Sequence, residues 1–97
     1  GWNFGPFDED VKSVKIVADN LIREWGDNVE WIKDGEVHPH EATLLKLDIS
    51  KALSRLNWSP KLRLNNAVAN TVKWHRGWLE GKSAKDLCIK EIEQFLN

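Results

Sequence analysis

An apolar stripe at helical spacing in residues 65–80 is the strongest constraint on how this chain can fold. Its members recur every three or four residues, at Ala67, Val68, Thr71, Val72, Trp74, Trp78 and Leu79. This period predicts an amphipathic helix that ends at Gly81 and buries Val68, Val72, Trp74 and Trp78. His75 lies in the middle of the apolar face, so we expect it to be a core residue rather than a catalytic one.

Weaker periodicities predict further helices over residues 13–25, 49–56 and 83–96. We expect Ser13 to cap the first of these helices and Gly26 to end it. The last helix is expected to bury Cys88, Ile92 and Phe95. Short strands are expected over residues 1–4, 29–32 and 43–47. The sequence therefore predicts a mixed α/β fold, mostly helical, in which short strands and about four helices form a single domain over residues 1–97.

Length and composition restrict the function classes. A chain of 97 residues supports one domain with a small core, and its net charge of −1 argues against nucleic acid or an anionic membrane as partner. No apolar stretch is long enough to cross a membrane, and the single cysteine, Cys88, suits a reducing cytoplasm. The chain has no methionine and opens on a strand-like segment, so we expect it to be part of a longer protein.

Three stretches carry a family resemblance. They are Trp-Asn-Phe-Gly-Pro at 2–6, His-Pro-His-Glu-Ala at 38–42 with Leu-Lys-Leu-Asp at 45–48 and Ser-Lys-Ala at 50–52, and Leu-Asn-Trp-Ser-Pro at 56–60 with Thr-Val-Lys-Trp at 71–74. Together they resemble the carboxy-terminal portion of the CDP-glucose 4,6-dehydratases, a branch of the extended short-chain dehydrogenase/reductases. Asn57 and His75 depart from that family, which usually has glycine and an aromatic residue at these places.

The resemblance implies the substrate-binding lobe of an enzyme that removes water from CDP-glucose, with NAD as cofactor, to give CDP-4-keto-6-deoxyglucose. Such chemistry needs a glycine-rich dinucleotide turn and a tyrosine–lysine pair. None of the six glycines is spaced to form that turn, and the chain contains no tyrosine. We therefore expect no catalytic, NAD-binding or metal-binding residue here, no activity without the amino-terminal domain, and a homo-oligomeric parent enzyme.

The resemblance also implies substrate-binding residues. Glu41, with His38 and His40, is expected to face the nucleotide, because a carboxylate can accept from both ribose hydroxyls and a histidine can donate to phosphate. Asn3 is expected to lie near the diphosphate. Simpler interpretations stay open: the His-x-His pair could bind zinc, residues 38–41 could be a solvated loop, and Asn3 could satisfy backbone near Gly5.

Two other functions remain possible from the sequence. The chain could be the same lobe of another sugar-nucleotide enzyme, such as an epimerase or a GDP-mannose 4,6-dehydratase. It could also be an autonomous helical module that binds a protein partner through an exposed apolar patch.

Overall fold

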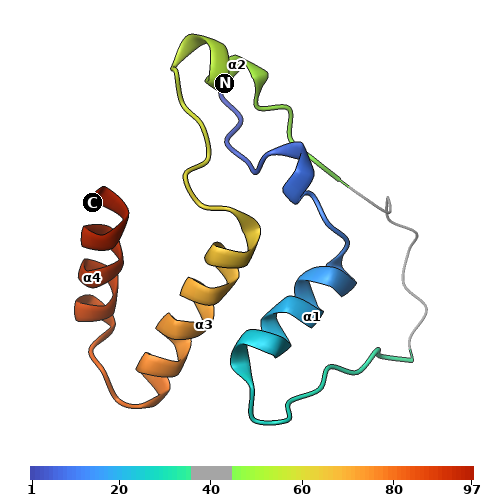
Figure 1. Ribbon diagram of the computed structural model, residues 1–97, viewed down its shortest axis with the longest axis vertical. Helices are drawn as coiled ribbons and strands as arrows, with labels where there is room; N and C mark the ends of the chain where they lie inside the picture. The colour runs from blue at the N-terminus through green and yellow to red at the C-terminus, as the bar shows by residue number, and fades with distance from the viewer. Residues whose placement is uncertain (36–44) are drawn as a thin grey trace.

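A computed structural model describes residues 1–35 and 45–97, and within these ranges the regular structure is helical (Figure 1). The elements are the 3₁₀ turn η1 (Asp8–Asp10) and the helices α1 (Val14–Trp25), α2 (Ser50–Arg55), α3 (Leu64–Leu79) and α4 (Ala84–Leu96). α3 packs on α1 on one side and on α4 on the other, so the three long helices form one layer. The amino terminus and α2 lie at one edge of this layer.

The four predicted helices are confirmed, and the predicted ends of α1 are as well. The Ser13 hydroxyl accepts a bond from the Ile16 backbone N–H at 3.4 Å, and Gly26 leaves the helix with a φ of 74°. Glycine suits that position because side chains disfavour positive φ. α4 begins in the same way as α1, since the Ser83 hydroxyl accepts from the Asp86 N–H at 3.4 Å. These caps supply partners to helix ends that have none within the helix.

The predicted strands are not present in the part of the chain that the structure describes. Residues 1–4, 29–32 and 45–47 carry no regular secondary structure, and residues 43–44 of the third predicted strand lie outside the described ranges. A strand exists only as part of a ladder, because its backbone N–H and C=O groups bond to a neighbouring strand. No described segment offers that pairing, so the α/β prediction is corrected to a helical fold.

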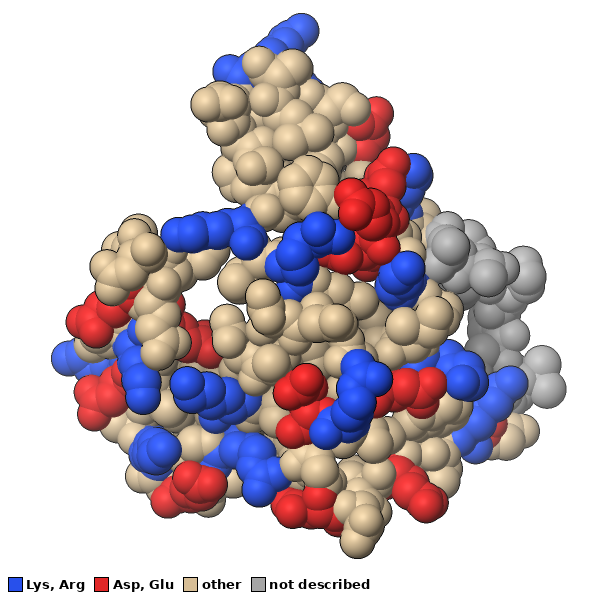
Figure 2. Space-filling model, viewed as in Figure 1, with Lys and Arg blue, Asp and Glu red and all other residues tan. Residues whose placement is uncertain are grey.

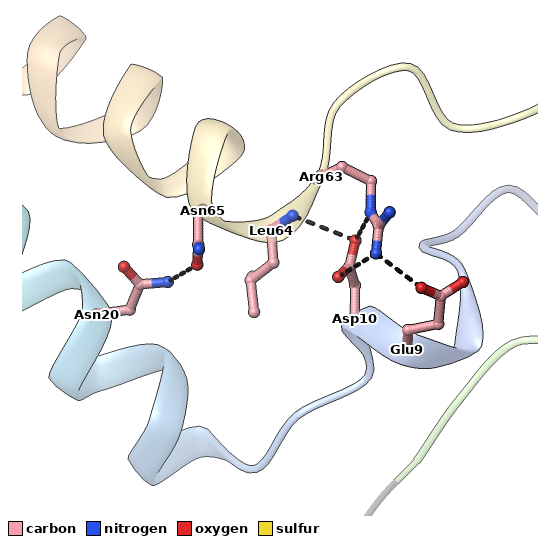
Figure 3. Close-up of polar contacts among 6 residues, drawn as sticks. All are labelled: Glu9, Asp10, Asn20, Arg63, Leu64 and Asn65. Carbon is pink, nitrogen blue, oxygen red and sulfur yellow. Dashed lines mark hydrogen bonds and ion pairs between the residues drawn. The ribbon is translucent and has the colours of Figure 1, made fainter.

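The contact between α1 and α3 combines a small apolar centre with polar ties. Val68 and Val72 are buried on the side of α3 that faces α1. Asn20 of α1 is also buried, and its Nδ2 donates to Asn65 Oδ1 at 2.8 Å (Figure 3). At the other end of the contact, the Arg76 guanidinium of α3 donates to the backbone carbonyl of Trp25. The polar bonds fix the position of one helix on the other, and the valines exclude water between them.

Much of the remaining apolar surface in the described residues is exposed. The radius of gyration of the chain is 16.3 Å, against about 12.5 Å for a compact chain of this length. Its accessible surface is 8205 Å², roughly 2,500 Å² more than a compact monomer of this mass exposes. A single helical layer has two broad faces, and a domain normally buries one of them against a second layer. The described residues contain no such second layer.

This open arrangement corrects several predicted core positions. Trp74 is half-buried, but Trp78 is 53% exposed, and His75, Cys88, Ile92 and Phe95 are exposed as well. The periodicity marked these positions as apolar faces of their helices. It could not show whether a second surface covers those faces, which is what burial depends on.

Candidate functional site

The first of the recognition stretches, residues 2–6, lies against the segment that contains α2. Asn3 Nδ2 donates to the backbone carbonyl of Asp48 at 3.3 Å. Lys51 Nζ donates to the Gly1 carbonyl at 2.9 Å and lies 4.4 Å from the centre of the Trp2 ring. These contacts join segments that are about 45 residues apart in sequence.

Two apolar contacts hold the same segments together. The Phe4 and Trp58 rings meet edge to face, with 5.0 Å between their centres. Gly5 lies against the segment before α2, because a β-carbon there would lie 3.5 Å from side-chain atoms of both Leu47 and Ile49. Edge-to-face aromatic pairs are a favourable geometry. Parts of all three recognition stretches therefore meet at this corner of the molecule.

Asp48 connects this corner to α2. Its Oδ1 accepts from the Ser50 hydroxyl at 2.5 Å and from the Ser50 N–H at 2.9 Å, just before the helix begins. The Ser50 hydroxyl lowers the pKa of the Asp48 carboxyl, and the backbone bond adds to this effect. The side chain of Asp48 thus accepts from the first N–H of α2 while its carbonyl orients Asn3, which places the exposed Asn3 amide beside the start of a helix.

A second polar cluster joins η1 to the start of α3 (Figure 3). The Arg63 guanidinium donates to both oxygens of Asp10, at 2.6 and 3.0 Å, and to Glu9 at 3.1 Å. Asp10 Oδ2 also accepts from the Leu64 N–H at 3.3 Å, so it satisfies one of the free amides at the start of α3. The Arg63 contact lowers the pKa of Asp10, and the carboxylates raise that of the guanidinium. This cluster is structural, and sequence analysis missed it.

Replacing Asp10 with asparagine is expected to lower the melting temperature at neutral pH more than replacing Asp8 does. Asp8 pairs with Lys46 and its side chain is 76% exposed, against 13% for Asp10. Because the folded pKa of Asp10 is lowered, its contribution is complete above the unfolded value of about 3.9 and is lost as pH falls through the folded value. The melting temperatures of the unmodified chain and of Asp10→Asn should therefore converge at acid pH. A pH-independent difference would contradict this account.

Of the predicted site residues, the structure places only Asn3. His38, His40 and Glu41 lie outside the described residues, so their relation to Asn3 stays a prediction. The zinc alternative for the two histidines is equally untested. For Asn3, the backbone partner is the distant Asp48 rather than the turn at Gly5.

Comparison with known proteins decides the relationship. No family model matches the chain. The CDP-glucose 4,6-dehydratase of Salmonella typhimurium is 44% identical over 97 residues, which cover 100% of this chain. The chain is a relative of the carboxy-terminal part of CDP-glucose 4,6-dehydratase. The resemblance found in the three sequence stretches is thereby confirmed.

The similarity extends over 27% of the length of the Salmonella CDP-glucose 4,6-dehydratase. Within this quarter, the corner formed by residues 1–7 and 47–58 brings together described residues from each of the three stretches. None of the helices in the described ranges is long and apolar enough to cross a membrane.

Proposed function

We propose that this chain is the nucleotide-sugar-binding part of a CDP-glucose 4,6-dehydratase and that it has no activity without the rest of that enzyme. The 44% identity over the whole chain is the observation that carries the proposal. The activity itself, the NAD-dependent loss of water from CDP-glucose, belongs to the longer protein. This chain has a single cysteine, Cys88, and so cannot form an internal disulfide, which suits an enzyme of the reducing cytoplasm.

The exposed Asn3 amide supports a ligand-binding role for the corner at residues 1–7 and 47–58. Its bond to the Asp48 carbonyl fixes the direction of the amide while leaving the side chain accessible. We propose that Asn3 contacts the substrate diphosphate and that Glu41, His38 and His40 contact the nucleotide. Backbone-anchored polar side chains on a rigid support are typical of binding sites.

Exposed apolar side chains at the same corner support docking of the rest of the enzyme there. Trp2, Phe4, Leu47 and Leu56 are each between 43 and 51% exposed. Figure 2 shows the surface around the amino terminus and α2 as largely uncharged. A surface of this kind is unusual on a free monomer and is typical of an interface.

The described residues do not fit a dinucleotide. A pyrophosphate needs a glycine-rich turn before a helix whose first N–H groups are free. Here α1 and α4 begin with capping serines, and Asp10 occupies the first N–H of α3. None of the described residues is therefore assigned to NAD, which in this proposal binds to the remainder of the parent enzyme.

A chimeric enzyme tests the proposal directly. The carboxy-terminal 27% of the Salmonella enzyme would be replaced by this chain, and turnover of CDP-glucose would be measured beside the isolated 97-residue protein. We expect turnover by the chimera and neither turnover nor NAD binding by the isolated chain. A folded chimera that turns over GDP-mannose instead, or nothing at all, would contradict the assignment. So would turnover by the pure isolated chain.

A further inference from the structure

Lys51 joins residues 1 and 2 to α2, of which it is the second residue (Figure 1). Its Nζ donates to the Gly1 carbonyl at 2.9 Å and lies 4.4 Å from the centre of the Trp2 ring. A lysine ammonium carries three N–H donors on a compact charge, so it can bond a carbonyl and hold an aromatic face at the same time. Among the described residues, Lys51 is the polar contact of both Gly1 and Trp2.

The backbone that carries Lys51 is firmly held. Ala52, the next residue, is 0% exposed, and Ile49, just before the helix, is 7% exposed. The Ala52 carbonyl accepts from the N–H groups of Leu56 and Trp58, at 3.1 and 3.2 Å, so the end of α2 is fixed as well. Lys51 therefore extends from a rigid support, although its own side chain is exposed.

Asn3 depends on the same support. Its Nδ2 donates to the Asp48 carbonyl through an exposed bond of 3.3 Å, which by itself holds the amide weakly. That bond uses one of the two Nδ2 hydrogens, and the other hydrogen and Oδ1 have no bond among the described residues. Because Asp48 and Lys51 are three residues apart, their two contacts hold the segment at residues 1–3 at neighbouring points.

We propose that Lys51 is a positioning residue for substrate binding. By holding Gly1 and Trp2 on α2, it fixes the direction in which Asn3 presents its amide to the diphosphate. This inference rests on the proposed function of the corner at residues 1–7 and 47–58. A donor that is ordered before binding gives a higher affinity, because the entropy of ordering it is not lost when the ligand binds. Lys51 acts here through Asn3 and not on the phosphate itself.

Nitrogen-15 relaxation at the Asn3 side-chain amide of the full 97-residue chain tests this role without substrate. Lys51→Met keeps the length of the side chain and removes the ammonium, so the order parameter of the Asn3 amide should fall. Lys51→Arg should restore it, because a guanidinium can also bond a carbonyl and lie on an aromatic ring. The melting temperature should change little, since Lys51 is exposed. An Asn3 amide that is equally ordered in Lys51→Met and in the unmodified chain would overturn the proposal.

Kinetics of the chimeric enzyme test the consequence for binding. We expect Lys51→Met to raise KM for CDP-glucose roughly two- to tenfold, the effect of about one hydrogen bond, with kcat unchanged. In an Asn3→Ala background the same substitution should have no further effect, because the residue that Lys51 positions is gone. Additive increases in KM would show that Lys51 acts on its own, for instance on the phosphate, and would remove the positioning role. An unchanged KM in Lys51→Met would do the same.

Lys46→Met is the matched control. Lys46 is also an exposed lysine near the start of α2, but its Nζ pairs with Asp8 at 3.2 Å. Its replacement should leave the order of the Asn3 amide and KM unchanged, and effects equal to those of Lys51→Met would contradict the proposal. The proposed function fails separately, if a chimera with the unmodified sequence does not turn over CDP-glucose. The relaxation measurement then still decides whether Lys51 positions Asn3.

Discussion

Replacing Val72 with aspartate is expected to unfold the isolated chain. Val72 is 4% exposed and is one of four buried apolar residues in the described ranges, the others being Ile49, Ala52 and Val68. A buried charge without a partner costs several kcal/mol, and small domains are stable by only about 5–15 kcal/mol. A chain with so small a core lies toward the low end of that range.

Leu79→Asp is the control for Val72→Asp. Leu79 belongs to the same helix and is 66% exposed, so the same charge there remains in water. Far-UV circular dichroism and thermal melts would compare the two variants. The packing described for α1 and α3 is wrong if Val72→Asp melts like the unmodified chain. It is equally wrong if the two substitutions have equal effects.

The second large effect is expected at Glu41, in the chimeric enzyme, and rests on the proposed function. Glu41→Gln keeps the size of the side chain and removes the charge that would accept from ribose hydroxyls. Losing a charge-assisted hydrogen bond of about 1.5–3 kcal/mol should raise KM for CDP-glucose roughly ten- to a hundredfold. The change should appear mainly in KM, because the contact is remote from the reacting carbons.

Glu30→Gln supplies the comparison for Glu41→Gln. Glu30 is exposed on the described part of the chain, and no role in binding is assigned to it. The Glu30→Gln substitution should leave KM and kcat unchanged. The melting temperature of Glu41→Gln should also stay close to that of the unmodified enzyme. Unchanged kinetics with a large fall in melting temperature would make Glu41 a structural residue and remove it from the site.

The helices were predictable because their signals are local. The period of α3, the Ser13 cap and the Gly26 stop are all encoded within a few residues of the structure they specify. The predictions that failed depend on distant surfaces. The strands required pairing partners, and burial of Trp78, Cys88 and His75 required a second layer. Periodicity identifies a face but not what covers it.

For the candidate site too, only the local features could be predicted from the sequence. The motif at residues 2–6 could be recognised from the sequence, but its support could not, because Asn3 bonds to Asp48 and Phe4 packs on Trp58. The bond between Arg63 and Asp10 joins residues that are 53 apart in the sequence. Long-range polar pairs leave no periodic trace in a sequence.

A groove of about 440 Å³ lies between α3 and α4, and Lys61 contacts Phe95 at its wide end. At the narrow end the helices are fixed by the close fit of Leu87 on Gly77, whereas at the wide end an exposed lysine is the tie between Phe95 and the segment before α3. A cation on an exposed aromatic face contributes only about 0.5–1 kcal/mol. The wide end of the helix pair is therefore held less firmly than the narrow end. A change in the angle between α3 and α4 is therefore expected to displace the carboxy-terminal end of α4 more than the junction at Gly77.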